Sequence, residues 1–96
     1  MLLGRVVGMV VATRKDEKLE GLRLMIVRQM DIEAHDGTGY VIAVDAVGAG
    51  VGEVVLYATG SSARQTIATD KRPCDAVIMA VVDTWEIGGQ VKFTKE

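Results

Sequence analysis

Three glycines that alternate with small residues form the stretch of this sequence closest in composition to a ligand-binding loop. They are Gly48, Gly50 and Gly52, and Glu53 follows them directly. Glycine has no Cβ, so its backbone adopts positive φ and approaches a phosphate, a turn or another chain closely. A dinucleotide-binding fingerprint needs a third glycine three positions after the second, and then a helix. Glutamate occupies that position and the Val-rich segment after it predicts a strand, so a phosphate cradle is disfavoured.

A serine pair beside an arginine is the second candidate for chemistry. Ser61 and Ser62 precede Arg64, an arrangement that places a hydroxyl nucleophile near a cation. A serine nucleophile needs a general base, and the only histidine, His35, lies in a polar segment next to a turn signal. We therefore expect Ser61 or Gly60 to cap a short helix, Arg64 to pair with a carboxylate, and His35 to be solvated.

The carboxylates nearest apolar segments are Asp45, Glu53 and Asp83, and no spacing argument brings two of them together. We expect them to serve as partners for Arg64 or for main-chain donors in turns. The single cysteine, Cys74, excludes an internal disulfide and a cysteine-only zinc site within one chain. No catalytic residue, cofactor or metal site is expected.

The elements that would position these residues are mostly strands. Strands are expected at residues 2–13, 22–30, 40–45, 53–59, 75–85 and 90–94, with one short helix at 61–68 and turns at Asp36-Gly37 and Gly88-Gly89. Five or six strands with one short helix predict a mainly all-β protein, a small β-barrel that occupies residues 1–96 as one domain. Trp85, near the end of the fifth strand, is expected to pack or to contact another subunit.

Several of these strands are apolar on both faces. Val6-Val7, Met25 to Val27 and Val77 to Val82 break the alternation expected of a half-solvated sheet. The barrel interior buries one face of each strand, and one short helix can cover little of the opposite face. We therefore expect further copies of the chain to bury the rest, in an obligate oligomer.

Composition narrows the classes of function. The chain has 96 residues, 49% of them hydrophobic and 4% aromatic, with a formal net charge of −2. This balance supplies neither a basic surface for nucleic acid nor a polybasic membrane patch, and no apolar run is long enough to span a bilayer. We expect a soluble cytoplasmic protein. The alternative to a structural role is a small oligomeric barrel that binds nucleic acid or a small ligand.

The combined motifs resemble the EutN/CcmL family, the pentameric vertex proteins of bacterial microcompartments such as carboxysomes and metabolosomes. The matching segments are 8–13, 22–25, 45–53, 60–64, 78–83 and 88–90. The resemblance implies an oligonucleotide-binding-like (OB-like) barrel, a homopentamer that caps the vertices of a polyhedral shell, and hexameric shell proteins as partners. It also implies a subunit contact or five-fold-axis site formed by Gly48, Ala49, Gly50, Gly52, Glu53, Ser61, Ser62 and Arg64.

Overall fold

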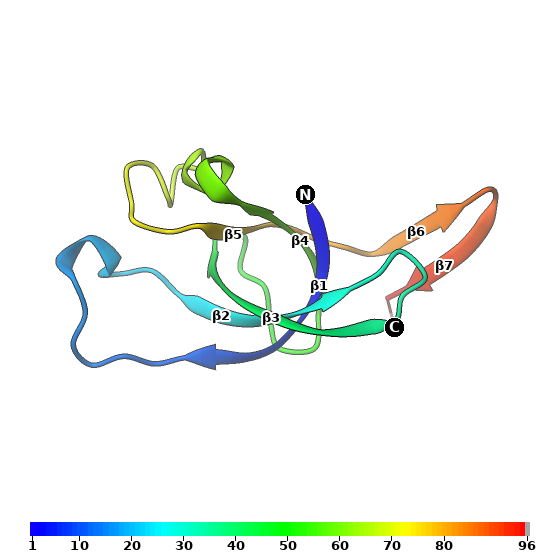
Figure 1. Ribbon diagram of the computed structural model, residues 1–96, viewed down its shortest axis with the longest axis horizontal. Helices are drawn as coiled ribbons and strands as arrows, with labels where there is room; N and C mark the ends of the chain where they lie inside the picture. Colours follow the sequence, from blue (N-terminus) through cyan, green and yellow to red (C-terminus); the bar gives the residue numbers. More distant parts are fainter. Residues whose placement is uncertain (96) are drawn as a thin grey trace.

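Residues 1–95, which the computed structural model describes, form a closed five-stranded barrel with a hairpin extending from it (Figure 1). The barrel strands are β1 (Leu2–Val10), β2 (Leu24–Met30), β3 (Asp36–Asp45), β4 (Val54–Thr59) and β5 (Ala76–Val81). The hairpin consists of β6 (Thr84–Ile87) and β7 (Gln90–Thr94). Two 3₁₀ helices, η1 (Glu17–Leu19) and η2 (Gly60–Arg64), and no α-helix occur in the described part of the chain. The predicted mainly-β barrel is confirmed.

The barrel closes in the order β1-β2-β3-β5-β4, with β1 bonded to both β2 and β4. Every neighbouring pair is antiparallel except β3 and β5, which run parallel. That parallel pair has only two registered positions, Val44 opposite Val77 and Asp45 opposite Ile78. The junction of β3 with β5 is therefore the shortest seam of the barrel.

Alternate residues of each strand point into the barrel and form its core. Val6, Val27, Val55, Tyr57 and Ile78 are all fully buried there. Branched aliphatic side chains fill most of this narrow interior, and Tyr57 and Met25 are its largest members.

A second apolar cluster lies outside the barrel, where η2 covers β3, β4 and β5 (Figure 1). Ala63 of η2 is fully buried against Val44, Ala58 and Val77, whose strand neighbours point inward. The sequence led us to expect that the chain covers little of the outer face of its own strands. That expectation is wrong where η2 packs on the barrel. The cover works because Ala63 is small enough to bring the η2 backbone close to the sheet.

The connection between β2 and β3 differs from the predicted turn. Asp36 and Gly37 begin β3 instead of forming a turn. The Asp31 carboxylate makes the reversal by accepting the backbone N–H groups of Glu33 and His35, both at 2.9 Å. Aspartate commonly bonds the backbone two residues ahead in this way, and Asp31 satisfies the loop before the predicted turn signal is reached.

Several other predicted elements also have different bounds; the strands expected at 40–45 and 53–59 are β3 and β4, which begin at Asp36 and Val54. The strand expected at 75–85 divides into β5 and β6, because the chain leaves the barrel at Val82 and Asp83. The helix expected at 61–68 is the shorter η2, whose N-cap is Thr59 and lacks a side-chain cap bond. The first strand ends at Val10 and the second begins at Leu24, because residues 11–23 form a loop that includes η1. The Gly88-Gly89 turn and the closing strand at 90–94 are confirmed.

Candidate functional site

One buried carboxylate fixes the start of the glycine loop, residues 46–53 between β3 and β4. Asp45 Oδ1 accepts hydrogen bonds from the backbone N–H groups of Val47, Gly48 and Ala49 at 3.0, 2.9 and 3.1 Å. Asp45 Oδ2 lies 3.1 Å from Arg23 Nη1, and the Asp45 side chain is only 1% exposed. Three converging N–H donors form a nest of the kind that binds anions, and here the chain fills it with its own carboxylate.

A second carboxylate fixes the end of the same loop. Glu53 Oε1 accepts the backbone N–H of Gly50 at 2.7 Å, and Glu53 Oε2 accepts from Lys95 Nζ at 2.6 Å. The backbone N–H of Gly52 donates to the carbonyl of Val6 at 2.7 Å. Lys95 follows β7, so this ion pair ties the base of the hairpin to the loop.

These contacts decide what the loop can bind. The N–H groups of residues 47, 48, 49, 50 and 52 are all occupied within the chain, so the loop has no row of free donors for a phosphate. Gly48 and Gly52 have φ of +80° and +95°, which explains two of the three glycines by backbone conformation alone. The loop surface that remains exposed is apolar, with Val51 63% exposed and Val47 43% exposed.

The other half of the predicted site lies at the opposite end of β4 (Figure 1). Ser61, Ser62 and Arg64 are exposed on η2, whereas the glycine loop precedes Val54. Within residues 1–95 no carboxylate pairs with Arg64, so the expected intrachain ion pair is absent. The two predicted groups therefore do not meet within one subunit, and their contact role stays a prediction.

The remaining candidates for chemistry have structural roles. His35 is exposed beside Asp31, with 3.6 Å between Nδ1 and Oδ2. Burial raises the pKa of the Cys74 thiol, which disfavours the thiolate, the reactive form of cysteine. Trp85 stacks on Phe93 with ring centroids 5.0 Å apart and donates its indole N–H to the Ile32 carbonyl at 2.9 Å.

Residues 1–95 contain no group of three or more His, Cys, Asp or Glu side chains arranged to hold a metal ion. None of the helices in that range is long and apolar enough to cross a membrane.

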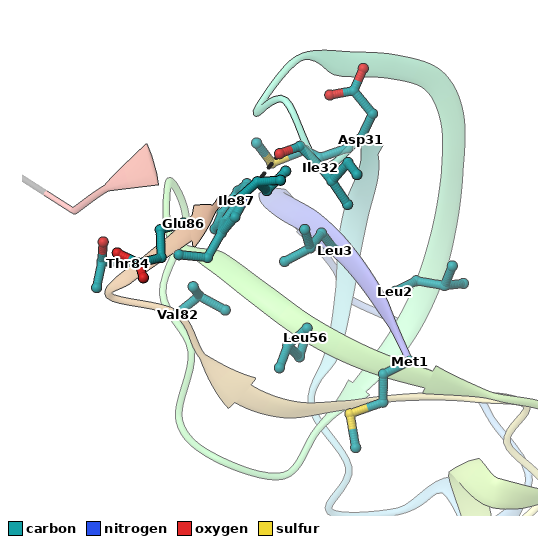
Figure 2. A pocket seen from close by; sticks show the side chains of 12 residues that line it. Met1, Leu2, Leu3, Asp31, Ile32, Leu56, Val82, Thr84, Glu86 and Ile87 are labelled. Atoms are coloured by element: carbon teal, nitrogen blue, oxygen red, sulfur yellow. Dashed lines mark hydrogen bonds between the residues drawn. The ribbon is translucent and has the colours of Figure 1, made fainter. Parts of the chain in front are cut away.

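An apolar groove of about 800 Å³ lies between the barrel and β6 (Figure 2). Its floor comes from the outer faces of β1, β2 and β4, and β6 forms one wall. The residues that line it are Met1, Leu2, Leu3, Met30, Asp31, Ile32, Leu56, Val82, Thr84, Trp85, Glu86 and Ile87. The sequence analysis did not find this groove.

The Glu53–Lys95 ion pair has a measurable pH dependence. The pKa of Glu53 is lowered, first by the hydrogen bond from Lys95 and then by the N–H of Gly50. A carboxyl group with a lowered folded pKa stabilises the fold above its ordinary value of 4.5, and this stabilisation is lost as the pH falls through the folded pKa. We therefore expect the loop and hairpin base to loosen in acid below pH 4.5.

The Lys95→Ala variant tests this expectation. The substitution removes the larger cause, so the pKa of Glu53 should rise toward its ordinary value, as measured by NMR titration of the side-chain carboxyl. Lys92→Ala is the matched control, because Lys92 Nζ pairs with Glu33 at 2.9 Å instead. A Glu53 pKa that does not change in Lys95→Ala would contradict the assignment.

The fold and the site together define a small β-barrel protein with a glycine loop held by two of its own carboxylates and an open apolar groove beside β6. Comparison with known proteins gives the particular family. The model of the family described as "Ethanolamine utilisation protein EutN/carboxysome" matches residues 1–83. The chain belongs to this EutN/CcmL family.

Relatives from different microcompartments match along nearly the whole chain. The carboxysome shell vertex protein CcmL of Gloeobacter violaceus is 35% identical, over 100% of this chain and 96% of its own. The bacterial microcompartment shell vertex protein PduN of Salmonella typhimurium is 42% identical, over 88% and 97% respectively. The structure of GrpN, a pentameric microcompartment shell protein from Rhodospirillum rubrum, superposes with a TM-score of 0.84 at 40% identity, over 91% and 99%. The chain is a microcompartment shell vertex protein and not an enzyme.

Proposed function

We propose that this chain, as one vertex domain over residues 1–96, forms a homopentamer that closes the corners of a microcompartment shell. The observation that carries the proposal is the apolar surface that one subunit leaves uncovered. Leu2, Tyr40, Ile42 and Val51 are each between 47% and 63% exposed, although they belong to the barrel or its braced loop. Exposed apolar surface on this scale marks a site of protein association. GrpN, which has the same fold, is described as pentameric.

The proposed mechanism is geometric. Hexameric shell proteins tile flat facets, and a closed polyhedron needs a five-fold unit wherever facets meet. The partners of the ring are therefore hexameric shell proteins. This chain supplies the five-fold geometry that curves the shell, and it catalyses no reaction. Cyclic rings of this kind use head-to-tail contacts between identical subunits.

The glycine loop suits a contact with a neighbouring subunit near the five-fold axis. Asp45 and Glu53 hold the loop in one conformation, so little conformational entropy is lost when a neighbour packs against it. The loop residues that would face a neighbour have no side chain or only a methyl group, so the backbones of two subunits can approach closely. These residues are Gly48, Ala49, Gly50 and Gly52. Ser61, Ser62 and Arg64 are proposed to make polar contacts from the other end of the subunit, where Arg64 would find a carboxylate across the interface.

Native mass spectrometry of the purified chain tests the proposal. A five-subunit ring is expected, and a stable monomer at micromolar concentration would overturn it. Gly50→Val tests whether the glycine loop contributes to assembly of the ring. Gly50 does not have a positive φ, so its backbone conformation does not require glycine, and an added Cβ there would lie 3.4 Å from Glu53 Oε1. The variant should weaken the ring more than Gly37→Val does.

A further inference from the structure

The outer surface of the barrel has three sectors, and only one of them is covered by the chain itself. η2 covers the sector over β3, β4 and β5. The two other sectors are the groove described above and a flat face on β1, β2 and β3. A subunit of a closed ring touches two neighbours through two different surfaces. These two open sectors therefore match the number of contacts that a ring requires.

The flat face consists of residues in adjacent strand positions. Ile26 is registered between Gly8 on β1 and Ile42 on β3, and Arg28 is registered opposite Tyr40. These side chains point outward, because their neighbours Met25 and Val27 are buried in the barrel core. Gly8 adds no side chain, which keeps this face flat.

The flat face carries exposed apolar side chains beside two cations: Arg28, and Arg5 of β1, which is registered opposite Arg28 and lies 3.8 Å from the Asp36 carboxylate. Tyr40 and Ile42 are 56% and 47% exposed. The Arg28 guanidinium lies 5.8 Å from the centre of the Tyr40 ring, a cation–π arrangement that also holds the positive charge at this face.

The groove is apolar like the flat face and carries charges of the opposite sign. Its floor is the outward row of Met30, Leu3 and Leu56, which are registered across β2, β1 and β4. Ile87 of β6 lies at its wall (Figure 2), and Trp85 of the same strand also lines the groove. Its polar members include two acids, Asp31 and Glu86, and both are exposed.

We propose that the groove of each subunit takes the flat face of the next subunit around the ring, with Tyr40 and Ile42 in the groove and Arg28 against its acidic rim. This inference rests on the proposed ring and assigns the two surfaces that form it. Opposite charges at the two surfaces select this pairing. Two flat faces would place Arg28 against Arg28, and two grooves would place acid against acid, so each surface disfavours pairing with itself.

Complementation between two variants tests the pairing. Ile87→Glu places a charge in the groove and leaves the flat face intact, whereas Ile42→Glu does the reverse. Ile67→Glu is the matched control, because Ile67 is fully exposed and lies in neither surface. Native mass spectrometry should show loss of the ring for the first two variants and an unchanged ring for the control, with circular dichroism verifying that every variant keeps its β fold.

The decisive measurement is the mixture of the two ring-deficient variants. The intact groove of Ile42→Glu should bind the intact flat face of Ile87→Glu, so a heterodimer should appear that neither variant forms alone, and no ring should follow. A ring that persists in either variant, a mixture without heterodimers, or a ring equally lost in Ile67→Glu would overturn the pairing. A wild-type chain that forms no ring would instead overturn the proposed function.

Discussion

Asp45→Ala is expected to lower the free energy of unfolding by about 2–4 kcal/mol, since it leaves three backbone donors without their acceptor and Arg23 without its carboxylate partner. The carboxylate accepts from the N–H groups of residues 47, 48 and 49 and is almost completely shielded from water. Hydrogen bonds to a charged acceptor contribute about 1.5–3 kcal/mol each, and those that share one oxygen are not additive. Asp45 also occupies one of the two registered positions of the β3–β5 seam.

Urea unfolding at a fixed protein concentration measures this effect, because the stability of an oligomer depends on concentration. Asp70→Ala is the control: Asp70 is exposed and its side chain makes no hydrogen bond or ion pair with another described residue, so its loss should cost less than about 0.5 kcal/mol. Asp45→Asn should fall between the two, because it keeps one acceptor oxygen without the charge. Equal costs for Asp45→Ala and Asp70→Ala would show that the loop does not depend on its carboxylate.

Gly4→Ala is expected to destabilise the barrel by about 1–3 kcal/mol, the usual cost of overpacking a core. A Cβ at position 4 would overlap Cγ1 of Val27, and would lie 2.9 Å from the Arg28 carbonyl and 3.0 Å from the ring of Tyr57. Two of these neighbours are backbone or a buried ring, so they cannot move aside freely.

A double variant separates this overlap from a loss of strand propensity. Val27→Ala removes the overlapping methyl group, so Gly4→Ala should cost less in that background than in the wild type. Gly8→Ala is the matched control on the same strand, because its Cβ would meet only Ile26 Cδ1 at an ordinary 3.6 Å. A cost for Gly4→Ala as small as that for Gly8→Ala would remove the packing explanation.

The sequence predicts the strands well and the connections between them poorly. Apolar runs such as residues 24–27 and 76–81 identify strands whichever neighbour they pair with. Connections depend on which polar side chain bonds the backbone first, as the Asp31 turn shows: Asp36-Gly37 is the stronger turn motif, yet Asp31 reverses the chain earlier. The same kind of signal, an aspartate at the end of a strand, marks the role of Asp45.

The candidate site was only partly predictable. The glycine spacing identifies the loop, and the assignment of Asp45 and Glu53 to main-chain donors is confirmed. The groove has no sequence signature, because Leu3, Met30, Leu56 and Ile87 come from four separate strands and only barrel closure brings them together. The cover that Ala63 supplies was also missed, since nothing in the composition of η2 distinguishes it from a solvated turn.

The two-residue seam between β3 and β5 has a consequence for the order in which the chain folds. β1, β2 and β3 pair between neighbours along the chain, and so do β4 and β5, whereas two junctions join strands distant in sequence: β1 with β4, and β3 with β5 at the seam. Contacts of high sequence separation form late, because the loop-closure entropy must be overcome first. The backbone amides of the seam should therefore exchange with deuterium sooner than those of the β2–β3 pair. The flat face needs only the local pairing of β1, β2 and β3, whereas the groove floor also needs β1 to pair with β4, so a subunit is ready to bind both neighbours only after the distant strands have paired.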